Sequence, residues 1–261
     1  MSDLDLPYRD YRSSHFGEGE DYHRKFCENR YRAIIWQLEQ HVLLDVVERH
    51  CRPISTARLL DFACGTGRVL SVLEDRVGES VGVDVAPSML RVAEPLLCRS
   101  RLLCCDITRA ADLDAERFDV ITAFRFFPNA EPSLREEAMA KLATLLAPRG
   151  VLVVNNHLRC GSLSHALRRG LSRIGLLNSK RDTHCMTDAE AVGLATRHGL
   201  VLAEEHHLGL LPVLKERRPL LPDRLIRRAE RVAARIDFLA PLASHKIYVL
   251  RHASASSEPG P

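Results

Sequence analysis

Three acidic residues, each at the end of a short apolar run, are the first candidates for chemistry in this sequence. Asp61 follows two leucines, Asp84 lies in the run SVGVDV, and Asp106 ends the run LLCCD. Short apolar runs bounded by turn residues are typical of buried strands. The carboxyl ends of such strands meet at one edge of an open α/β sheet, where ligands bind. The sequence therefore predicts three carboxylates that accept hydrogen bonds around one ligand.

A glycine loop follows the first of these acids. The segment 61–67 reads DFACGTG, and an apolar, helix-like pattern comes directly after it. Gly65 and Gly67 allow the backbone to pass close to a ligand, and the helix start offers free N–H groups. An ordinary strand-to-helix turn is the alternative. Leu70 stands where the dinucleotide fingerprint has its third glycine, which argues against a pyrophosphate ligand.

The order D-x-A-C-G-T-G resembles the first motif of the class I S-adenosylmethionine-dependent methyltransferases. In that family the acid and the loop hold the methionyl end of the cofactor. The resemblance therefore implies cofactor contacts for Asp61, Ala63, Gly65 and Gly67. Ala63 replaces the family's first glycine, a departure that costs little where the backbone is not at positive φ. The resemblance covers residues 55–155 well, and the two ends only by strand order.

The same resemblance assigns roles to residues after the next two strands. Asp84 corresponds to the acid that accepts from the ribose hydroxyls, and Met89 is expected to pack on the adenine. Asp106, followed by Ile107, matches the acid that accepts from the adenine amino group. The alternatives are a helix cap for Asp84, just before Pro87, and a simple loop acid for Asp106.

The acceptor side is expected after the fourth and fifth strands. Phe124, a candidate cofactor contact, opens the segment FRFFPNA, whose aromatic rings can exclude water around the sulfonium and face its positive charge. Core packing is the alternative for Phe126 and Phe127. Arg125 is a candidate for an acidic acceptor or for a structural carboxylate. His157 is a candidate general base for a hydroxyl acceptor, with a surface histidine as the alternative. The histidines show no metal-binding spacing, and we expect no metal.

Strand and helix patterns alternate along the chain, as in a parallel sheet with crossover helices. Helices are expected over 28–50, from Pro87, over 133–145, 187–199 and 223–239, with capping boxes at Ser133/Glu136 and Thr187/Glu190. Strands are expected at 59–62, 80–85, 102–106, 118–124, 151–155, 200–208 and 245–250. The predicted fold is α/β, with a doubly wound, seven-stranded, mostly parallel sheet of the Rossmann-like methyltransferase type and an antiparallel seventh strand.

The domain boundaries are predicted from the composition of each segment and from the positions of proline and glycine, which break regular secondary structure. Residues 1–52 are predicted to form an N-terminal helical cap, and five aromatic residues among the first 27 indicate that part of it packs on the domain. Residues 53–251 are predicted to form the methyltransferase domain, with lid or cap insertions at 156–186 and 211–241. Residues 252–261 are expected to be a disordered tail. The cap and the first insertion are expected to form the acceptor pocket.

Composition excludes several classes. The 261 residues carry a formal charge of +3, too little to indicate nucleic acid. No apolar run is long enough to span a bilayer and no leader is visible. The eight cysteines lack C-x-x-C pairs and are interpreted as buried, reduced thiols of a cytoplasmic protein. The helix 223–239 carries five arginines, and we expect its apolar face to be buried against the domain. That face consists of Leu225, Ala229, Val232 and Ile236.

The function that these features favour is transfer of a methyl group from S-adenosylmethionine to a small-molecule or lipid-like acceptor. One alternative is a non-catalytic, methyltransferase-like subunit that binds a protein or membrane partner through its arginine-rich helix. A nucleotide-sugar or dinucleotide enzyme is disfavoured by Leu70. We expect a soluble enzyme, with peripheral membrane contact as the alternative. The sequence assigns neither the acceptor nor the oligomeric state.

Overall fold

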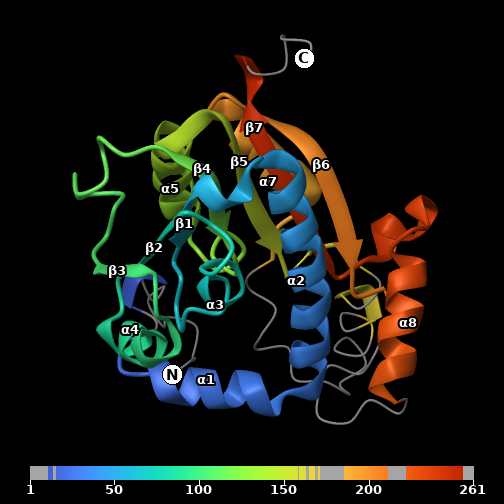
Figure 1. The fold of residues 1–261 in the computed structure, drawn as a ribbon. Helices are drawn as coiled ribbons and strands as arrows, with labels where there is room; N and C mark the ends of the chain where they lie inside the picture. Colours follow the sequence, from blue (N-terminus) through green and yellow to red (C-terminus); the bar gives the residue numbers. More distant parts are fainter. Residues whose placement is uncertain are drawn as a thin grey trace, which may run out of the picture.

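In the computed structural model, one seven-stranded sheet carries the candidate residues (Figure 1). The structure describes residues 11–13, 16–157, 159–162, 165–167, 170, 185–210 and 222–254. The strands are β1 (Arg58–Phe62), β2 (Glu79–Asp84), β3 (Arg101–Cys104), β4 (Phe118–Ala123), β5 (Leu146–Asn156), β6 (Leu200–Leu208) and β7 (His245–His252). Their order is β3-β2-β1-β4-β5-β7-β6, and β7 runs antiparallel to both of its neighbours. The predicted mostly parallel sheet with an antiparallel seventh strand is confirmed.

Helices cover both faces of this sheet. They are α1 (Gly19–Glu28), α2 (Arg30–His50), α3 (Leu70–Leu73), α4 (Pro87–Ala93), α5 (Pro132–Leu145), α7 (Asp188–Arg197) and α8 (Asp223–Ala233), with short 3-10 turns η1 (Tyr11–Ser13), η2 (Ile54–Thr56), η3 (Glu94–Leu96) and η4 (Asp237–Leu242). One buried cluster joins α2 and α3 to one face, and a second joins α5 and α7 to the other. The doubly wound arrangement is therefore confirmed.

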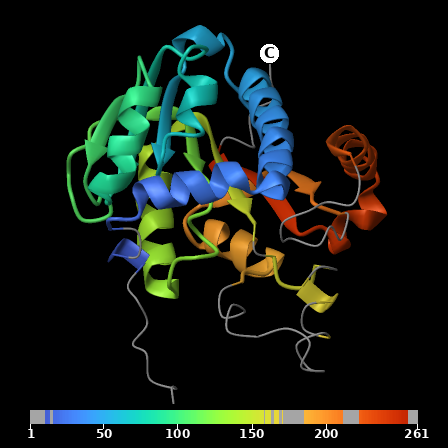
Figure 2. The same cartoon turned by 90° about the horizontal axis from the view of Figure 1, so that it is seen from below.

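The N-terminal helices lie across the end of the sheet where the parallel strands finish. Figure 2, viewed onto this end, shows α1 crossing in front of the sheet before the chain turns into α2. The turn is at Asn29, whose side chain accepts from the backbone N–H of Arg32 and caps α2. Gly19 of α1 lies so close to Ser88 of α4 that a β-carbon would be 2.0 Å from the Ser88 carbonyl oxygen. This contact fixes α1 over the carboxyl ends of β1 and β2.

One of the two predicted capping boxes is confirmed. Thr187 accepts from the backbone N–H of Glu190, whose carboxylate accepts from Thr187 in return. The box at Ser133 and Glu136 is wrong. There the helix begins one residue earlier, with Pro132 at its first position and no side-chain cap. Proline needs no partner for a missing N–H, so the helix start is stable without the box.

The interpretation of the cysteines needs correction. Cys160 and Cys185 form a disulfide, and Cys27, Cys98 and Cys104 are exposed. The two bonded residues are 25 positions apart, a separation that no local spacing rule detects. The disulfide joins two points of the expected 156–186 insertion. Most of that insertion, the 211–221 stretch and the tail 255–261 lie outside the described residues, so the lid and tail remain predictions.

The arginine-rich helix packs on a different face from the expected one. Ile226 and Glu230 of α8 are buried, whereas Leu225 and Val232 are 54% and 57% exposed. Glu230 turns inward because its carboxylate accepts from the backbone N–H groups of Gly209 and Leu210, each at 3.0 Å. The predicted burial of the Leu225 and Val232 face is therefore wrong. No helix among the described residues has the length and apolar content to span a bilayer.

Candidate ligand-binding site

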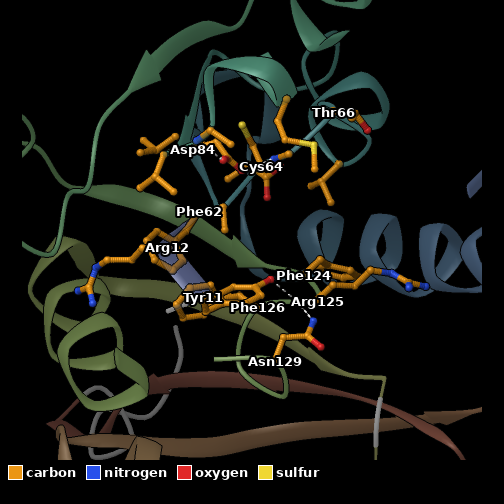
Figure 3. Close-up of a pocket in the computed structure, with 18 of the residues that line it drawn as sticks. Tyr11, Arg12, Phe62, Cys64, Thr66, Asp84, Phe124, Arg125, Phe126 and Asn129 are labelled. Carbon is orange, nitrogen blue, oxygen red and sulfur yellow. Dashed lines mark hydrogen bonds between the residues drawn. The ribbon is translucent and has the colours of Figure 1, made fainter. Parts of the chain in front are cut away.

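A cavity of about 530 Å³ opens at the carboxyl ends of β1, β2 and β4 (Figure 3). Its lining includes every predicted site residue except Gly67, namely Asp61, Ala63, Gly65, Asp84, Met89, Asp106, Ile107, Phe124, Arg125 and His157. Figure 3 shows Cys64, Thr66 and Asp84 on one side and Tyr11, Phe126 and Arg125 on the other. The topology therefore brings the strand-end acids, the glycine loop and the predicted acceptor side to one place.

Asp61 is held at the end of β1 by its parallel neighbour. The register pairs Asp61 with Thr122 of β4, and the Thr122 hydroxyl donates to Asp61 Oδ1 at 2.7 Å. The other oxygen, Oδ2, is buried with no hydrogen-bond partner among the described residues. Burial raises the pKa of Asp61 to about 7, although the Thr122 hydrogen bond and the charge of Arg68 lower it. The site thus contains a buried carboxylate with one oxygen open to a cationic or hydrogen-bonding group.

The backbone of the loop takes positive φ angles at Ala63 (54°), Gly65 (56°) and Gly67 (75°). The condition for a low cost at Ala63 is therefore not met, and the left-handed conformation costs roughly 1–2 kcal/mol for a residue with a side chain. A β-carbon on Gly65 would meet nothing within 4 Å, so this residue leaves open space. One on Gly67 would lie 3.1 Å from Ala93 and 3.0 Å from Leu97. Gly67 therefore allows helix packing rather than lining the cavity.

Asp84 fixes the loop from the end of β2. Its Oδ2 accepts from the Gly65 N–H at 2.8 Å, and its Oδ1 accepts from the Ala86 N–H at 2.9 Å. The N-cap position of α4 is occupied by Ala86, which makes no side-chain cap bond, so Asp84 does not cap this helix. Met89 and Ile107, both buried, form apolar lining beside it.

Asp106 is engaged by the N-terminal segment. Thr108 donates to Oδ1 through its backbone N–H at 3.0 Å and its hydroxyl at 2.6 Å. Arg12 of η1 donates to Oδ2 at 2.6 Å and also pairs with Glu137. Burial raises the pKa of Asp106, but these hydrogen bonds outweigh it and hold the pKa below its usual range. The sequence did not identify Arg12 or Tyr11 as site residues, although the aromatic content of this segment indicated packing.

Arg125 has a backbone that is held in an unusual conformation. Its φ is +62°, in the left-handed region. Its N–H donates to Asn155 Oδ1 at 2.6 Å, and its carbonyl oxygen accepts from Tyr11 at 3.2 Å and Asn129 at 2.6 Å. Asn155 in turn donates to the buried Glu39 at 2.9 Å. Non-glycine residues in such conformations persist where their surroundings fix them, and they cluster at functional sites.

Aromatic rings and His157 complete the acceptor side. Phe126 makes edge contacts with Tyr11, Phe62 and Phe127 at ring-centre distances of 5.6, 4.7 and 5.2 Å. Phe126 also lines the cavity, whereas Phe127 is a core residue of the second sheet face. His157, just past β5, is 8% exposed and lines the cavity, so it is not a surface histidine. The part of the chain that the structure describes contains no cluster of His, Cys, Asp and Glu suited to a metal ion.

Comparison with known proteins agrees with this geometry. Residues 59–150 match a family model described as a methyltransferase domain. The magnesium protoporphyrin IX methyltransferase of Synechocystis PCC 6803, solved with bound SAH, is similar in structure at a TM-score of 0.63 and 13% identity, with 92% of this chain and 97% of that chain covered. An S-adenosylmethionine-dependent methyltransferase of Clostridium acetobutylicum gives a TM-score of 0.58 at 13% identity, covering 89% and 98%. No curated protein matches this chain significantly in sequence.

Proposed function

We propose that this chain, a class I S-adenosylmethionine-dependent methyltransferase, methylates a small-molecule acceptor bound beside Phe124, Arg125 and His157. The observation that carries the proposal is the single cavity that Asp61, the Gly65 loop and Asp84 share with those three residues. Its volume of about 530 Å³ lies within the range of small-molecule sites. The magnesium protoporphyrin IX methyltransferase, whose structure is similar, acts on a small molecule as its name states.

The residues of the cavity fit the cofactor. The unpartnered Oδ2 of Asp61 is suited to the methionyl ammonium group, and the open space beside Gly65 allows the ligand to approach the backbone. Asp84 would accept from the ribose, since each carboxylate oxygen holds a second lone pair beyond its bond to a backbone N–H. Met89 and Ile107 offer apolar contact for the adenine, and Asp106 would accept from its amino group.

When bound, S-adenosylmethionine would supply an electrophilic methyl group on sulfur, with the sulfur as leaving group, to the lone pair of the acceptor. The chain itself contributes proximity and orientation, the main terms for such a displacement. His157 would receive the proton of a hydroxyl acceptor. Phe124 and Phe126 exclude water from the reacting atoms.

The non-catalytic alternative is weaker. A subunit without activity would not require a buried acid with an unpartnered oxygen or an arginine held at positive φ, because both features destabilise the fold. The exposed apolar residues of α8 are compatible with a docking role in addition to catalysis.

Calorimetric titration separates these alternatives. We expect S-adenosylhomocysteine to bind the wild-type chain and NAD not to bind. Metabolite extract incubated with the protein and methyl-deuterated S-adenosylmethionine should then yield a product that carries the label. Binding of NAD in preference to S-adenosylhomocysteine would refute the proposal. Binding without any labelled product, in extracts from several growth conditions, would favour the non-catalytic subunit.

A further inference from the structure

Two guanidinium groups meet over one aromatic ring at the acceptor side of the cavity. The Arg68 guanidinium lies 3.8 Å from the ring centre of Phe26, and that of Arg125 lies 5.2 Å from the same centre. Arg68 also lies 5.4 Å from the ring centre of Trp36. Both arginines line the cavity, and they come from different elements, the loop after β1 and the end of β4. Cation–π contacts within about 6 Å orient a guanidinium without neutralising its charge.

Neither guanidinium has a carboxylate partner within ion-pair distance among the residues that the structure describes. The Nη1 atom of Arg68 is buried and makes no hydrogen bond in that part of the chain. Elsewhere the arginines of this protein are commonly paired, as Arg58 is with Glu79 and Glu116. A buried cation without a partner is expensive, so this arrangement indicates a site that an anion completes.

Glu39 is an acid that interacts electrostatically with both arginines, but it forms no ion pair with either among the described residues. It is fully buried on α2, and its Oε1 accepts from Asn155 instead. Burial raises the pKa of Glu39, which disfavours its charged form. Burial lowers the pKa of Arg68, and the positive charge of Arg125 lowers it further. Together they outweigh the opposite effect of Tyr22, Glu39 and Asp61. Two like charges therefore remain beside each other at the wall of the cavity.

A network of hydrogen bonds fixes the position of the Arg125 backbone. Its left-handed backbone is held by Asn155, Asn129 and Tyr11, and Asn155 is held in turn by Glu39. Glu39 thus orients the arginine through the backbone without pairing with its side chain. An arginine that served only to pair with a structural carboxylate would not need this network. The network instead fixes the backbone of Arg125, a residue that lines the cavity.

We propose that the methyl acceptor carries a carboxylate, which Arg68 and Arg125 bind together while Phe26 holds their guanidinium planes. This proposal rests on the proposed function and assigns the chemical class of its acceptor. The planar fork of each guanidinium matches the two oxygens of a carboxylate, and weak hydration makes arginine suited to a half-buried anion site. The methionyl carboxylate of the cofactor is a second source of the same group, so the test must distinguish the two.

The test uses benzoate and its neutral analogue benzamide as probes, titrated at constant ionic strength into protein saturated with S-adenosylhomocysteine. We expect benzoate to bind at least tenfold more tightly than benzamide. Arg68→Gln and Arg125→Gln should each remove this preference, and Arg125→Lys should restore part of it. Arg228→Gln, on the exposed surface of α8, is the matched control and should leave it unchanged. Thermal unfolding of each variant reports whether the fold is intact.

Each outcome has one meaning. If wild-type protein does not bind S-adenosylhomocysteine, the proposed function fails before the acceptor is tested. If it binds S-adenosylhomocysteine but binds benzoate and benzamide equally, or binds neither, only the carboxylate proposal is overturned. If Arg125→Gln weakens S-adenosylhomocysteine binding tenfold or more, the pair holds the cofactor's own carboxylate, and the acceptor proposal is again wrong.

Discussion

Replacing Asp61 with asparagine should separate the contribution of this residue to binding from its cost to stability. Burial raises the pKa of Asp61 to about 7, against an ordinary value of 3.8. A shift of about three units corresponds to a ceiling of about 4 kcal/mol of destabilisation when the carboxylate is ionised. The asparagine side chain keeps an oxygen for the Thr122 hydroxyl and carries no charge to bury.

The sign of the pH dependence follows from proton binding. Between the unfolded and the folded pKa, the folded protein binds more protons than the unfolded chain, so its free energy of unfolding falls as pH rises. The loss begins near pH 4 and is complete somewhat above pH 7. Asp61→Asn removes this contribution. The difference in stability between variant and wild type should therefore grow in favour of the variant across this window.

The assay is urea unfolding of the ligand-free protein at several pH values from about 5 to 8, with wild type and Asp61→Asn in parallel. The slope of the difference is the readout, because any cost of burying the new amide is independent of pH. S-adenosylhomocysteine affinity should show the opposite trend: it should rise with pH for wild type and stay low and flat for the variant. A stability difference that does not change with pH, or a variant that binds as well as wild type, would refute the reasoning.

Four further substitutions are predicted from other features of the structure. Gly65→Val should weaken S-adenosylhomocysteine binding at least tenfold in titration, because the new side chain enters open cavity space. Gly67→Ala should lower the melting temperature, because its β-carbon contacts α4, and it should affect affinity less. Asp84→Asn loses an acceptor for one of two backbone N–H groups and the charge that strengthens its bonds to the ribose. Binding should therefore weaken by roughly 1.5–3 kcal/mol in the same assay, and a change well under tenfold would contradict this. The exposed Leu225 lies beside the arginines of α8, so the wild-type protein should sediment with anionic vesicles and Leu225→Glu should not. Retention of the wild-type protein in the supernatant at low salt would exclude membrane contact through α8.

The positions of the acidic residues at the ends of the strands were predictable from the sequence. The strand-end positions of Asp61, Asp84 and Asp106 follow from short apolar runs and the parallel topology, and all three line one cavity. The partners of these acids were not predictable. Arg12 reaches Asp106 across 94 positions, and no pattern in the sequence indicates which arginine does so. Ala63 shows a second limit, because the left-handed turn is imposed by the loop as a whole and not by the preference of that residue.

The orientation of α8 shows that a single buried polar group can determine which face of a helix is buried, against the pattern of its apolar residues. Periodicity assigns Leu225 and Val232 to the interior, since they share one helix face with Ala229. Two backbone N–H groups at the end of β6, those of Gly209 and Leu210, need an acceptor once they are buried, and Glu230 supplies it. Turning Glu230 inward rotates the helix so that Ile226 is buried beside it and Leu225 is left outside. Leaving two buried N–H groups without acceptors costs about 1–3 kcal/mol each, which is comparable with the roughly 1.5–3 kcal/mol gained by burying one leucine. The polar requirement of the neighbouring strand therefore decides the packing face, and the apolar residues are left available beside the arginines.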